Sequence, residues 1–397
     1  MSEDRMFSLA FSQPEGKSRR NAPKQGLVIT LLTKMLGGRI RKACPLQGVH
    51  RVSVVVPCYN YGRFLRQCVT SLITDQPGID VEIIIVDDKS TDNSLETARQ
   101  LQREEPCVKV IAHETNQGHI ATYNEGLDAA TGDYVLLLSA DDLVTPGALT
   151  RAAELLAAEP SVGLVYGNAI HFHDTLPQSR TDQSGWIIWP GNDWLSLRCK
   201  SGYNVVASPE VIMRTSTLRS FGGYRADLPH AGDFEMWLRT SAVADIGFLL
   251  NVDQAYHRHH TSNMNKVDFS SGTTNGRFID LSQRWQSFQV VFSGVGRGLH
   301  NAAELLELAR KTMSRQALEH VSYAYARGKR DFPYKRFEAL ALEIDPAARQ
   351  SPMGRAVARR ERLGILPLPI HPLWALPAIA FRLAEYLRRW RRGKIGV

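Results

Sequence analysis

Two runs of apolar residues decide the fold of this chain: VSVVVPCYN at residues 52–60 and VEIIIVDDKS at residues 81–90. Each run is rich in β-branched residues and too short for a helix, which is typical of a strand buried on both faces. Pro57 ends the first run, and Asp87 ends the second. Residues 63–74, between the two runs, have the apolar spacing of a helix. This order of strand, helix and strand predicts a pair of parallel strands.

The same alternation continues along the chain and predicts an α/β fold with a mostly parallel central sheet and a C-terminal helical extension. Loops that follow parallel strands lie at one edge of the sheet, where ligands bind. The predicted strands are residues 52–56, 81–86, 108–112, 134–138, 162–166, 205–213 and 246–250. The predicted helices are residues 63–74, 92–103, 120–130, 146–158, 233–244 and 302–327.

At 397 residues the chain exceeds the roughly 150 residues of an average domain. A content of 43% hydrophobic and 22% charged residues excludes a disordered chain. We predict a basic N-terminal segment at residues 1–50, the α/β domain at 51–265, a helical extension at 266–350 and a basic, apolar tail at 351–397.

The formal net charge of +8 is unevenly distributed, because basic residues dominate both ends of the chain and acidic residues dominate the middle. A basic chain is compatible with nucleic-acid binding. However, the sequence has no Cys/His finger, no helix-turn-helix signature and no glycine-aromatic strand motif. We therefore predict no nucleic-acid partner.

The C-terminal tail combines the apolar stretch Leu363–Phe381, which carries four prolines, with the basic amphipathic segment Arg382–Lys394. This combination predicts an interfacial or re-entrant membrane dock, and the alternative is a proline-rich arm packed on the catalytic domain. The segment Gln25–Lys42 suits an amphipathic surface helix or, equally, a core-packing arm. The expected location is cytoplasmic and peripheral, on the inner face of the cell membrane. The sequence does not indicate the oligomeric state.

Acidic residues follow two of the predicted strands. Asp88 follows the second strand, where a carboxylate can accept the N–H of a base or a ribose hydroxyl. Asp141 and Asp142 follow the apolar run YVLLL at residues 134–138, and paired carboxylates suit Mg²⁺ bound to a phosphate. Each feature alone is usually only a turn or a helix cap. Several polar residues that follow strands at the same edge of one sheet together indicate a ligand site.

Six motifs in the chain resemble those of the family 2 glycosyltransferases of GT-A fold, in the same order. They are PCYN (57–60), VDDKSTD (86–92), NQGHIATYNEGL (116–127), SADD (139–142), HAGDFEMWLR (230–239) and YHRHHTSNM (256–264). The resemblance covers about residues 52–265. It implies a GT-A type domain that binds a nucleotide-diphosphate-sugar.

The resemblance also implies a role for several residues. The expected donor is a UDP-sugar, with the Tyr59 ring stacked on uracil and Asp88 accepting the uracil N–H. The implied donor-binding residues are Pro57, Tyr59, Asn60, Asp88, Gly118, Asn124 and Asp141. The implied ligands of Mg²⁺ or Mn²⁺ are Asp141, Asp142 and His260. Family members commonly carry a third Asp where this chain has Ser139.

Asp233 is the candidate general base that takes the proton of the acceptor hydroxyl. Its alternative role is that of a helix N-cap. A single displacement would invert the anomeric configuration, as the resemblance implies. The alternative for His260 is that it lies on a solvated strand edge and binds no metal. Three tryptophans suit either stacking on an acceptor sugar or ordinary core packing: Trp186, Trp189 and Trp194.

The sequence thus favours an inverting, metal-dependent glycosyltransferase that acts on a hydroxyl of a saccharide or glycolipid in surface polysaccharide assembly. One alternative is a catalytically degenerate nucleotide-sugar-binding or scaffold protein, for which the Ser139 replacement is the hint. A sugar-phosphate nucleotidylyltransferase is less favoured, because it needs a glycine-rich loop with a basic residue after the first strand. That loop is absent from the sequence.

Overall fold

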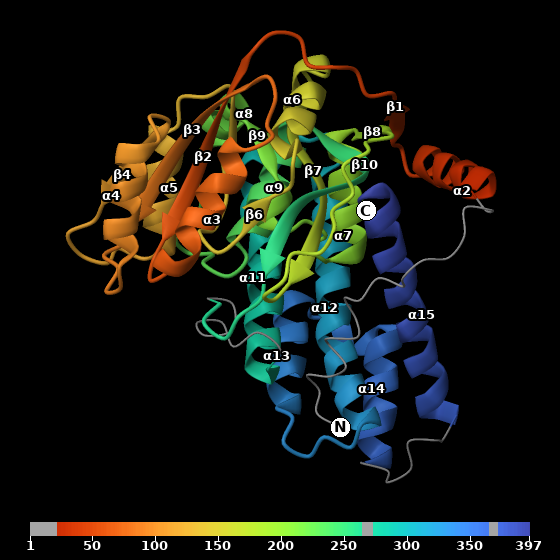
Figure 1. Cartoon of the computed structure of the whole chain (residues 1–397). Coiled ribbons are helices and arrows are strands. Elements are labelled where there is room, and N and C mark those ends of the chain that lie inside the picture. The colour runs from red at the N-terminus through yellow and green to blue at the C-terminus, as the bar shows by residue number, and fades with distance from the viewer. Residues whose placement is uncertain (1–21, 264–272, 365–371) are drawn as a thin grey trace.

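The computed structural model describes residues 22–263, 273–364 and 372–397. In Figure 1 a sheet with helices around it occupies one part of the molecule, and long C-terminal helices extend from that part. The strands are β1 (Arg39–Arg41), β2 (His50–Cys58), β3 (Ile79–Asp87), β4 (Val108–Ala112), β5 (Tyr134–Leu137), β6 (Leu143–Val144), β7 (Val162–Phe172), β8 (Gly185–Trp189), β9 (Ile212–Arg214) and β10 (Asp245–Arg258).

The helices include three short 3-10 turns, η2 to η4. The helices around the sheet are α2 (Ala22–Met35), α3 (Gly62–Ile73), α4 (Ser94–Glu104), α5 (His119–Ala129), α6 (Ala148–Ala158), α7 (Gly191–Ser201), η2 (Ser208–Glu210), α8 (Thr215–Phe221) and α9 (Gly232–Val243). The later helices are α11 (Thr274–Ser293), η3 (Val295–Gly298), α12 (Ala302–Ala326), α13 (Tyr334–Ile344), η4 (Ala348–Gln350), α14 (Pro352–Leu363) and α15 (Pro372–Ile395).

All ten strands belong to one mixed sheet, in the order β1-β8-β10-β7-β9-β5-β2-β3-β4, with β6 paired to β10. The block β5-β2-β3-β4 is parallel, and so is the pair β7-β10. β9 joins the two blocks, because it runs antiparallel to both β5 and β7. Because β9 runs antiparallel to both of its neighbours, β7 points the same way as β5, and most strands of the sheet share this direction. The predicted α/β fold with mostly parallel strands is confirmed.

The two founding strands are buried on both faces, as their uninterrupted apolar runs predict. Val54 and Ile83 face one hydrophobic cluster, whereas Val55 and Ile84 face the other, and all four are at most 1% exposed. Successive side chains of a strand point to opposite faces, so one apolar run contributes to both cores.

The predicted helices and strands are largely confirmed, and the differences include the following three. Residues 205–213 were expected to form one strand, but residues 208–210 form η2, with Pro209 inside this short helix, and β9 begins only at Ile212. β10 continues to Arg258, well beyond the predicted end at residue 250, because its polar half still pairs with β7. β8, with the sequence GWIIW, was not predicted.

The C-terminal helices extend the core of the sheet domain. α11 packs on α9, and α12 packs on both α7 and α11. The rings of Phe234 in α9 and Phe288 in α11 lie 5.4 Å apart, edge to face. One hydrophobic cluster therefore runs from the sheet into the helical extension.

The end of the tail, beyond the segment predicted as a membrane dock, also packs into this core. Ile395 and Val397 are at most 1% exposed. The Trp189 indole N–H donates to the Ile395 carbonyl at 3.2 Å, and the Tyr166 hydroxyl donates to the Gly396 carbonyl. The last residues thus follow the alternative of an arm packed on the domain. Of the apolar stretch, residues 365–371 lie outside the described residues.

Among the described residues, none of the helices combines the length and the apolar character that a membrane crossing requires. The segment Gln25–Lys42 forms α2 and then β1, which pairs with β8 at the edge of the sheet. This segment therefore combines both predicted roles, a surface helix and a packed arm.

The three tryptophans of residues 186–194 are core residues, and the acceptor-stacking hypothesis for them is wrong. Trp186, Trp189 and Trp194 are at most 1% exposed. The Trp194 indole N–H donates to the Tyr166 hydroxyl at 3.3 Å. Trp189 and Trp194 lie in the hydrophobic cluster that also contains Ile395 and Val397, whereas Trp186 lies in the other cluster. Their burial leaves no face for a sugar.

A buried ion pair between Arg392 of α15 and Glu210 of η2 predicts that the end of α15 contributes to stability. The two side chains meet at 2.6 Å, and the Glu210 side chain is fully buried. Arg392→Ala should lower the free energy of unfolding by about 3 kcal/mol, because it leaves a buried carboxylate without its cation. Arg389→Ala is the matched control, since this residue forms an exposed pair with Glu385 worth about 0.5 kcal/mol. Urea unfolding measures both; equal losses would contradict the packing of α15.

Candidate active site

The carboxyl ends of β2, β3, β5, β7 and β10 lie along one edge of the sheet, because these strands point the same way. Every predicted site residue follows one of these strands or belongs to a loop or helix that packs beside them. In the structure these residues form three clusters, one around each of Asp88, Asp141 and Asp233.

Asp88 holds the loop between β4 and α5. It is 4% exposed, and its carboxylate accepts the N–H groups of Gln117 at 2.7 Å and Gly118 at 2.9 Å. His113 Nδ1 lies 2.7 Å from Asp88, and its Nε2 lies 2.6 Å from Glu125. Burial lowers the pKa of His113, but these two hydrogen bonds outweigh it and raise the pKa above its usual value. The predicted contact of Asp88 with uracil stays a prediction.

Pro57 lies near the end of β2, and the loop after this strand carries Tyr59 and Asn60. The Tyr59 side chain is 47% exposed, so its ring is open to a stacking partner. The Asn60 side-chain oxygen accepts the N–H of Thr91 at 2.7 Å and that of Asp92 at 3.3 Å. Asn60 therefore ties the loop after β2 to the loop after β3. The contact of these residues with a donor stays a prediction.

Gly118 and Asn124 lie at α5. Gly118 has a φ of +84°, and no heavy atom stands within 4 Å of where a Cβ would be, so its backbone borders open space. The side-chain amide of Asn124 donates to the Tyr224 carbonyl at 2.9 Å and accepts the Tyr224 N–H at 2.7 Å. Asn124 thus anchors the segment before α9. Its predicted donor contact stays a prediction.

Asp141 and His260 lie side by side, as expected for two ligands of one ion. His260 Nε2 is 2.9 Å from Asp141 Oδ2, and the Asn263 amide donates to the same oxygen at 3.1 Å. Burial would raise the pKa of Asp141, but hydrogen bonds with His260 and Ser139 hold that pKa below its usual value. An ionised carboxylate beside an imidazole fits a divalent cation such as Mn²⁺.

Asp142 points instead toward β10. It accepts the Arg258 N–H at 2.8 Å, and its other oxygen lies 3.1 Å from His257 Nδ1. Burial lowers the pKa of His257, but the charge of Asp142 raises it to about 9. In the described ranges, Asp141, Asp142 and His260 do not bring three ligand atoms within 4.8 Å of one another. Asp142 as a metal ligand stays a prediction.

Asp233 lies in the first turn of α9 and lines a cavity of about 400 Å³. The Ser208 hydroxyl donates to its carboxylate at 2.7 Å, and the Tyr224 hydroxyl donates at 2.9 Å. Burial raises the pKa of Asp233 above that of an ordinary aspartate, against the effect of these two bonds. His171 and His257 line the same cavity.

His257 links the cavity of Asp233 to Asp142, because it touches Asp142 and lines the cavity. Burial raises the pKa of Tyr123, and the negative charges of Asp233, Asp141 and Asp142 raise it further.

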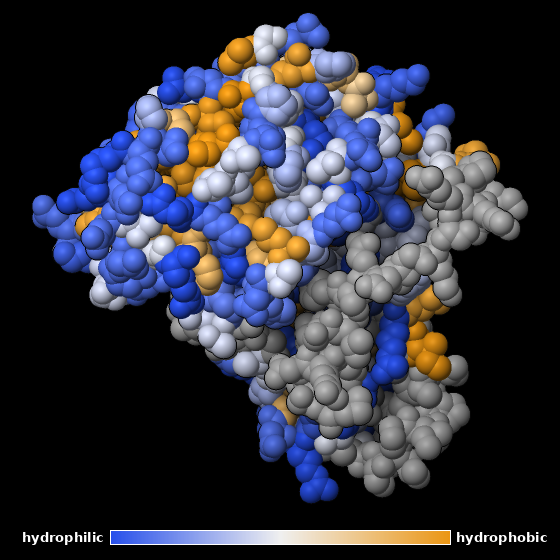
Figure 2. Space-filling model, viewed as in Figure 1, coloured by the Kyte–Doolittle hydropathy of each residue, from blue (hydrophilic) through white to orange (hydrophobic). Residues whose placement is uncertain are grey.

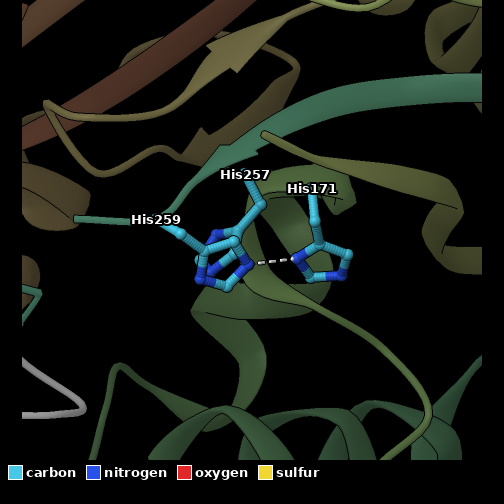
Figure 3. Close-up of side chains that lie close together, drawn as sticks. All are labelled: His171, His257 and His259. Carbon is cyan, nitrogen blue, oxygen red and sulfur yellow. Dashed lines mark hydrogen bonds between the residues drawn. The ribbon is translucent and has the colours of Figure 1, made fainter. Parts of the chain in front are cut away.

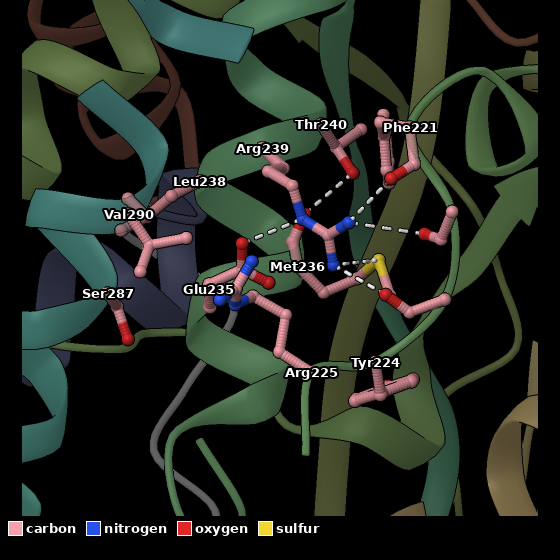
Figure 4. A network of polar contacts seen from close by, with 12 residues as sticks. Phe221, Tyr224, Arg225, Glu235, Met236, Leu238, Arg239, Thr240, Ser287 and Val290 are labelled. Carbon is pink, nitrogen blue, oxygen red and sulfur yellow. Dashed lines mark hydrogen bonds and ion pairs between the residues drawn. The ribbon is translucent and has the colours of Figure 1, made fainter. Parts of the chain in front are cut away.

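A buried ion pair supports the position of Asp233. Glu235 and Arg239 of α9 meet at 2.7 Å, and their side chains are 0% and 9% exposed. The Arg239 guanidinium also donates to the carbonyls of residues 221–223, at 2.9, 3.2 and 2.7 Å (Figure 4). These bonds fix the segment that carries Tyr224. The predicted motif HAGDFEMWLR therefore supplies both Asp233 and the anchor of its hydrogen-bond partner.

Sequence reasoning missed four residues that shape the site: His113, His171, Ser208 and Tyr224. Ser208 and Tyr224 both contact Asp233, but Ser208 lies in the short helix η2, which was expected to be part of a strand, and Tyr224 lies in an irregular segment. His171 was missed because the predicted strand ended at residue 166, five residues short of it. His113, the residue after β4, follows a strand end, which is the one signal that could have found it.

The mixed sheet and its edge of carboxylates agree with the predicted GT-A fold. Residues 53–221 match the family model "Glycosyl transferase family 2". The predicted resemblance to this family is confirmed over these residues.

Two curated relatives extend the match. An uncharacterised glycosyltransferase of Nostoc sp. is 36% identical over 153 residues, which cover 36% of this chain and 47% of the relative. Chondroitin synthase of Pasteurella multocida is 25% identical over 264 residues, which cover 63% of this chain and 26% of the relative. This chain thus spans half or less of the length of these relatives.

A solved structure is also similar. The crystal structure of S. aureus TarS superposes with a TM-score of 0.51 at 18% sequence identity, covering 78% of this chain and 55% of that chain. At this identity the likeness shows the fold alone, and it agrees with the predicted GT-A fold.

Proposed function

We propose that this protein is an inverting, metal-dependent glycosyltransferase. It transfers a sugar from a nucleotide-sugar, with a UDP-sugar as the expected donor, to a hydroxyl of a saccharide or glycolipid acceptor in surface polysaccharide assembly. The single observation that carries the proposal is the position of Asp233, a carboxylate of raised pKa in a cavity that reaches Asp142 through His257. The polysaccharide synthase among its relatives supports the acceptor class.

The donor occupies the carboxyl edge of the sheet in this proposal. Tyr59 offers an exposed ring to the base, and Gly118 offers a backbone that a ligand can approach closely. Asp141 and His260, with Asp142, hold Mg²⁺ or Mn²⁺. The bound cation supplies Lewis-acid stabilisation of the negative charge that develops on the diphosphate. Asp141 suits this role because it is held ionised beside an imidazole.

Asp233 acts as the general base. The acceptor hydroxyl enters the cavity of about 400 Å³ and gives its proton to the Asp233 carboxylate as it attacks the anomeric carbon. The Ser208 and Tyr224 hydroxyls hold the carboxylate in place. Burial raises its pKa, which makes it a stronger base than an exposed aspartate.

Metal removal tests the donor half of the site. UDP should bind roughly tenfold or more weakly in chelator than with Mn²⁺, a difference of about 1.4 kcal/mol or more, because the diphosphate loses its cation. Calorimetry measures both affinities. Asp141→Asn should abolish the difference, whereas Asp128→Asn, on the exposed side of α5, should keep it. Equal UDP affinity with and without metal would remove Asp141 and His260 as ligands.

Substitution of Asp233 tests the base. Asp233→Asn should keep donor binding but lower turnover by about two orders of magnitude or more, because an amide cannot take the acceptor proton. The amide can still bond the Ser208 and Tyr224 hydroxyls, since a hydroxyl both donates and accepts. Asp227→Asn is the control, because Asp227 is exposed and forms an ion pair with Arg225.

The pH profile gives a second readout. The base works only when ionised, so wild-type turnover should fall as the pH drops through the raised pKa of Asp233. This acidic limb should lie above the ordinary aspartate range and should be absent from the residual turnover of Asp233→Asn. Near-normal turnover with an unchanged profile in the folded variant would exclude Asp233 as the base.

We also propose that α2 and α15 attach the enzyme to the anionic inner face of the cell membrane. The two helices contact each other, and Figure 2 shows an apolar patch on the α15 side of the molecule. The exposed apolar side chains are Leu27, Val28, Leu31 and Met35 of α2, and Ile379, Leu383, Tyr386 and Leu387 of α15. Lys34, Arg382 and Arg389 are exposed on the same helices. Basic residues near an anionic surface contribute on the order of 1 kcal/mol each.

Vesicle flotation tests this attachment with substitutions, because truncation of α15 would also remove its core contacts. Leu383→Ser with Leu387→Ser should reduce flotation even at high salt, since apolar burial is not screened. Arg382→Gln with Arg389→Gln should reduce flotation on anionic vesicles. Flotation on neutral vesicles should not increase in this variant. Val49→Ser, at a residue 75% exposed elsewhere, is the control. A full-length protein that ignores anionic vesicles would contradict the attachment.

A further inference from the structure

Three histidines outside the predicted metal set form a second cluster of ligating groups. His171, His257 and His259 each offer one ring nitrogen, and these nitrogens all lie within 4.8 Å of one another. His171 Nδ1 lies 2.8 Å from His259 Nε2. Figure 3 shows the three rings gathered at the ends of two strands. The ring centroids are 4.9 to 5.3 Å apart in all three pairs.

The sheet itself holds these rings together. β7 and β10 run parallel, and His171 is the register partner of His257. The His259 N–H donates to the Phe172 carbonyl at 2.8 Å, which continues the pairing past the end of β10. All three rings therefore project from one paired backbone. Ligands on rigid strands are held in place before an ion binds, which favours binding.

His257 has the outer partner that is typical of a metal-bound histidine. Its Nδ1 lies 3.1 Å from Asp142 Oδ2, so its Nε2 is the nitrogen left for an ion. A carboxylate on the far nitrogen fixes the ring orientation and makes the ligating nitrogen more basic. His173 adds a contact on the other side, because its Nδ1 lies 3.1 Å from the His259 carbonyl.

We propose that His171, His257 and His259 bind one divalent cation of the zinc class, in a site separate from Asp141 and His260. Three imidazole nitrogens suit Zn²⁺, Co²⁺ or Ni²⁺, whereas Mg²⁺ prefers oxygen ligands. A three-histidine zinc site keeps a fourth position open. His171 and His257 line the cavity of Asp233, so the open position faces the cavity and takes an oxygen of water or of a bound acceptor. Cation binding by these three histidines does not depend on the proposed glycosyl transfer.

Cobalt binding to the full-length protein tests this site, because four-coordinate Co²⁺ gives visible absorption bands that are far more intense than those of an octahedral ion. The wild type should bind one Co²⁺ with these bands, and Zn²⁺ should displace it. His171→Gln and His259→Gln should each weaken binding by roughly tenfold or more. The matched control is His230→Gln, which changes a histidine of the same cavity outside the cluster.

Asp141→Asn separates this site from the proposed donor metal. It should remove the metal dependence of UDP binding and leave the cobalt bands unchanged. Thermal melting checks that each variant folds, and either histidine variant suffices if the other does not fold. Absence of visible bands in the wild type would overturn the site. Bands that persist in a folded His171→Gln or His259→Gln variant, or that vanish in Asp141→Asn, would overturn it as well.

Discussion

The short strand β9 pairs antiparallel with β5 on one side and with β7 on the other. These two reversals turn the β7-β10 pair to point the same way as the β5-β2-β3-β4 block. Without them the ends of β7 and β10 would lie at the opposite edge of the sheet. The late histidines and the early aspartates meet only because of this pairing: Asp141 touches His260, and Asp142 touches His257.

Each buried carboxylate of the site has partners that keep it in place. A buried charge without a partner is costly, so burial alone would favour neutral carboxyls. Asp88 has His113 and two backbone N–H groups, and Asp141 has His260. The hydroxyls of Ser208 and Tyr224 hold Asp233. Hydrogen bonds with His260 and Ser139 keep the pKa of Asp141 below its usual value, whereas burial raises the pKa of Asp233, and both directions suit the proposed roles of metal ligand and base.

Much of the fold could be predicted from sequence, because its central strands are buried on both faces and appear as uninterrupted apolar runs. The polar half of β10 has no such run, since its order there comes from pairing with β7. β8 was missed although its residues are buried, because a short apolar run with two tryptophans also suits a loop. The last residues of the tail could not be placed from sequence, because the burial of Ile395 and Val397 depends on contacts with distant segments that no local pattern reveals.

Within the site, the motifs located the residues that follow strands, such as Asp88 and Asp141. Contacts between distant segments could not be predicted, because Ser208 in η2 and Tyr224 in an irregular segment reach Asp233 only in the folded chain. The same limit hid the cluster around His171, which exists only through the register of β7 and β10.

The most direct test of the central proposal is a structure of the protein with UDP and Mn²⁺ bound. We predict that the diphosphate lies beside Asp141 and His260, that the uracil lies beside Tyr59, and that the cavity of Asp233 opens toward the diphosphate. A nucleotide bound away from the carboxyl edge of the sheet, or a cation that contacts neither Asp141 nor His260, would contradict it.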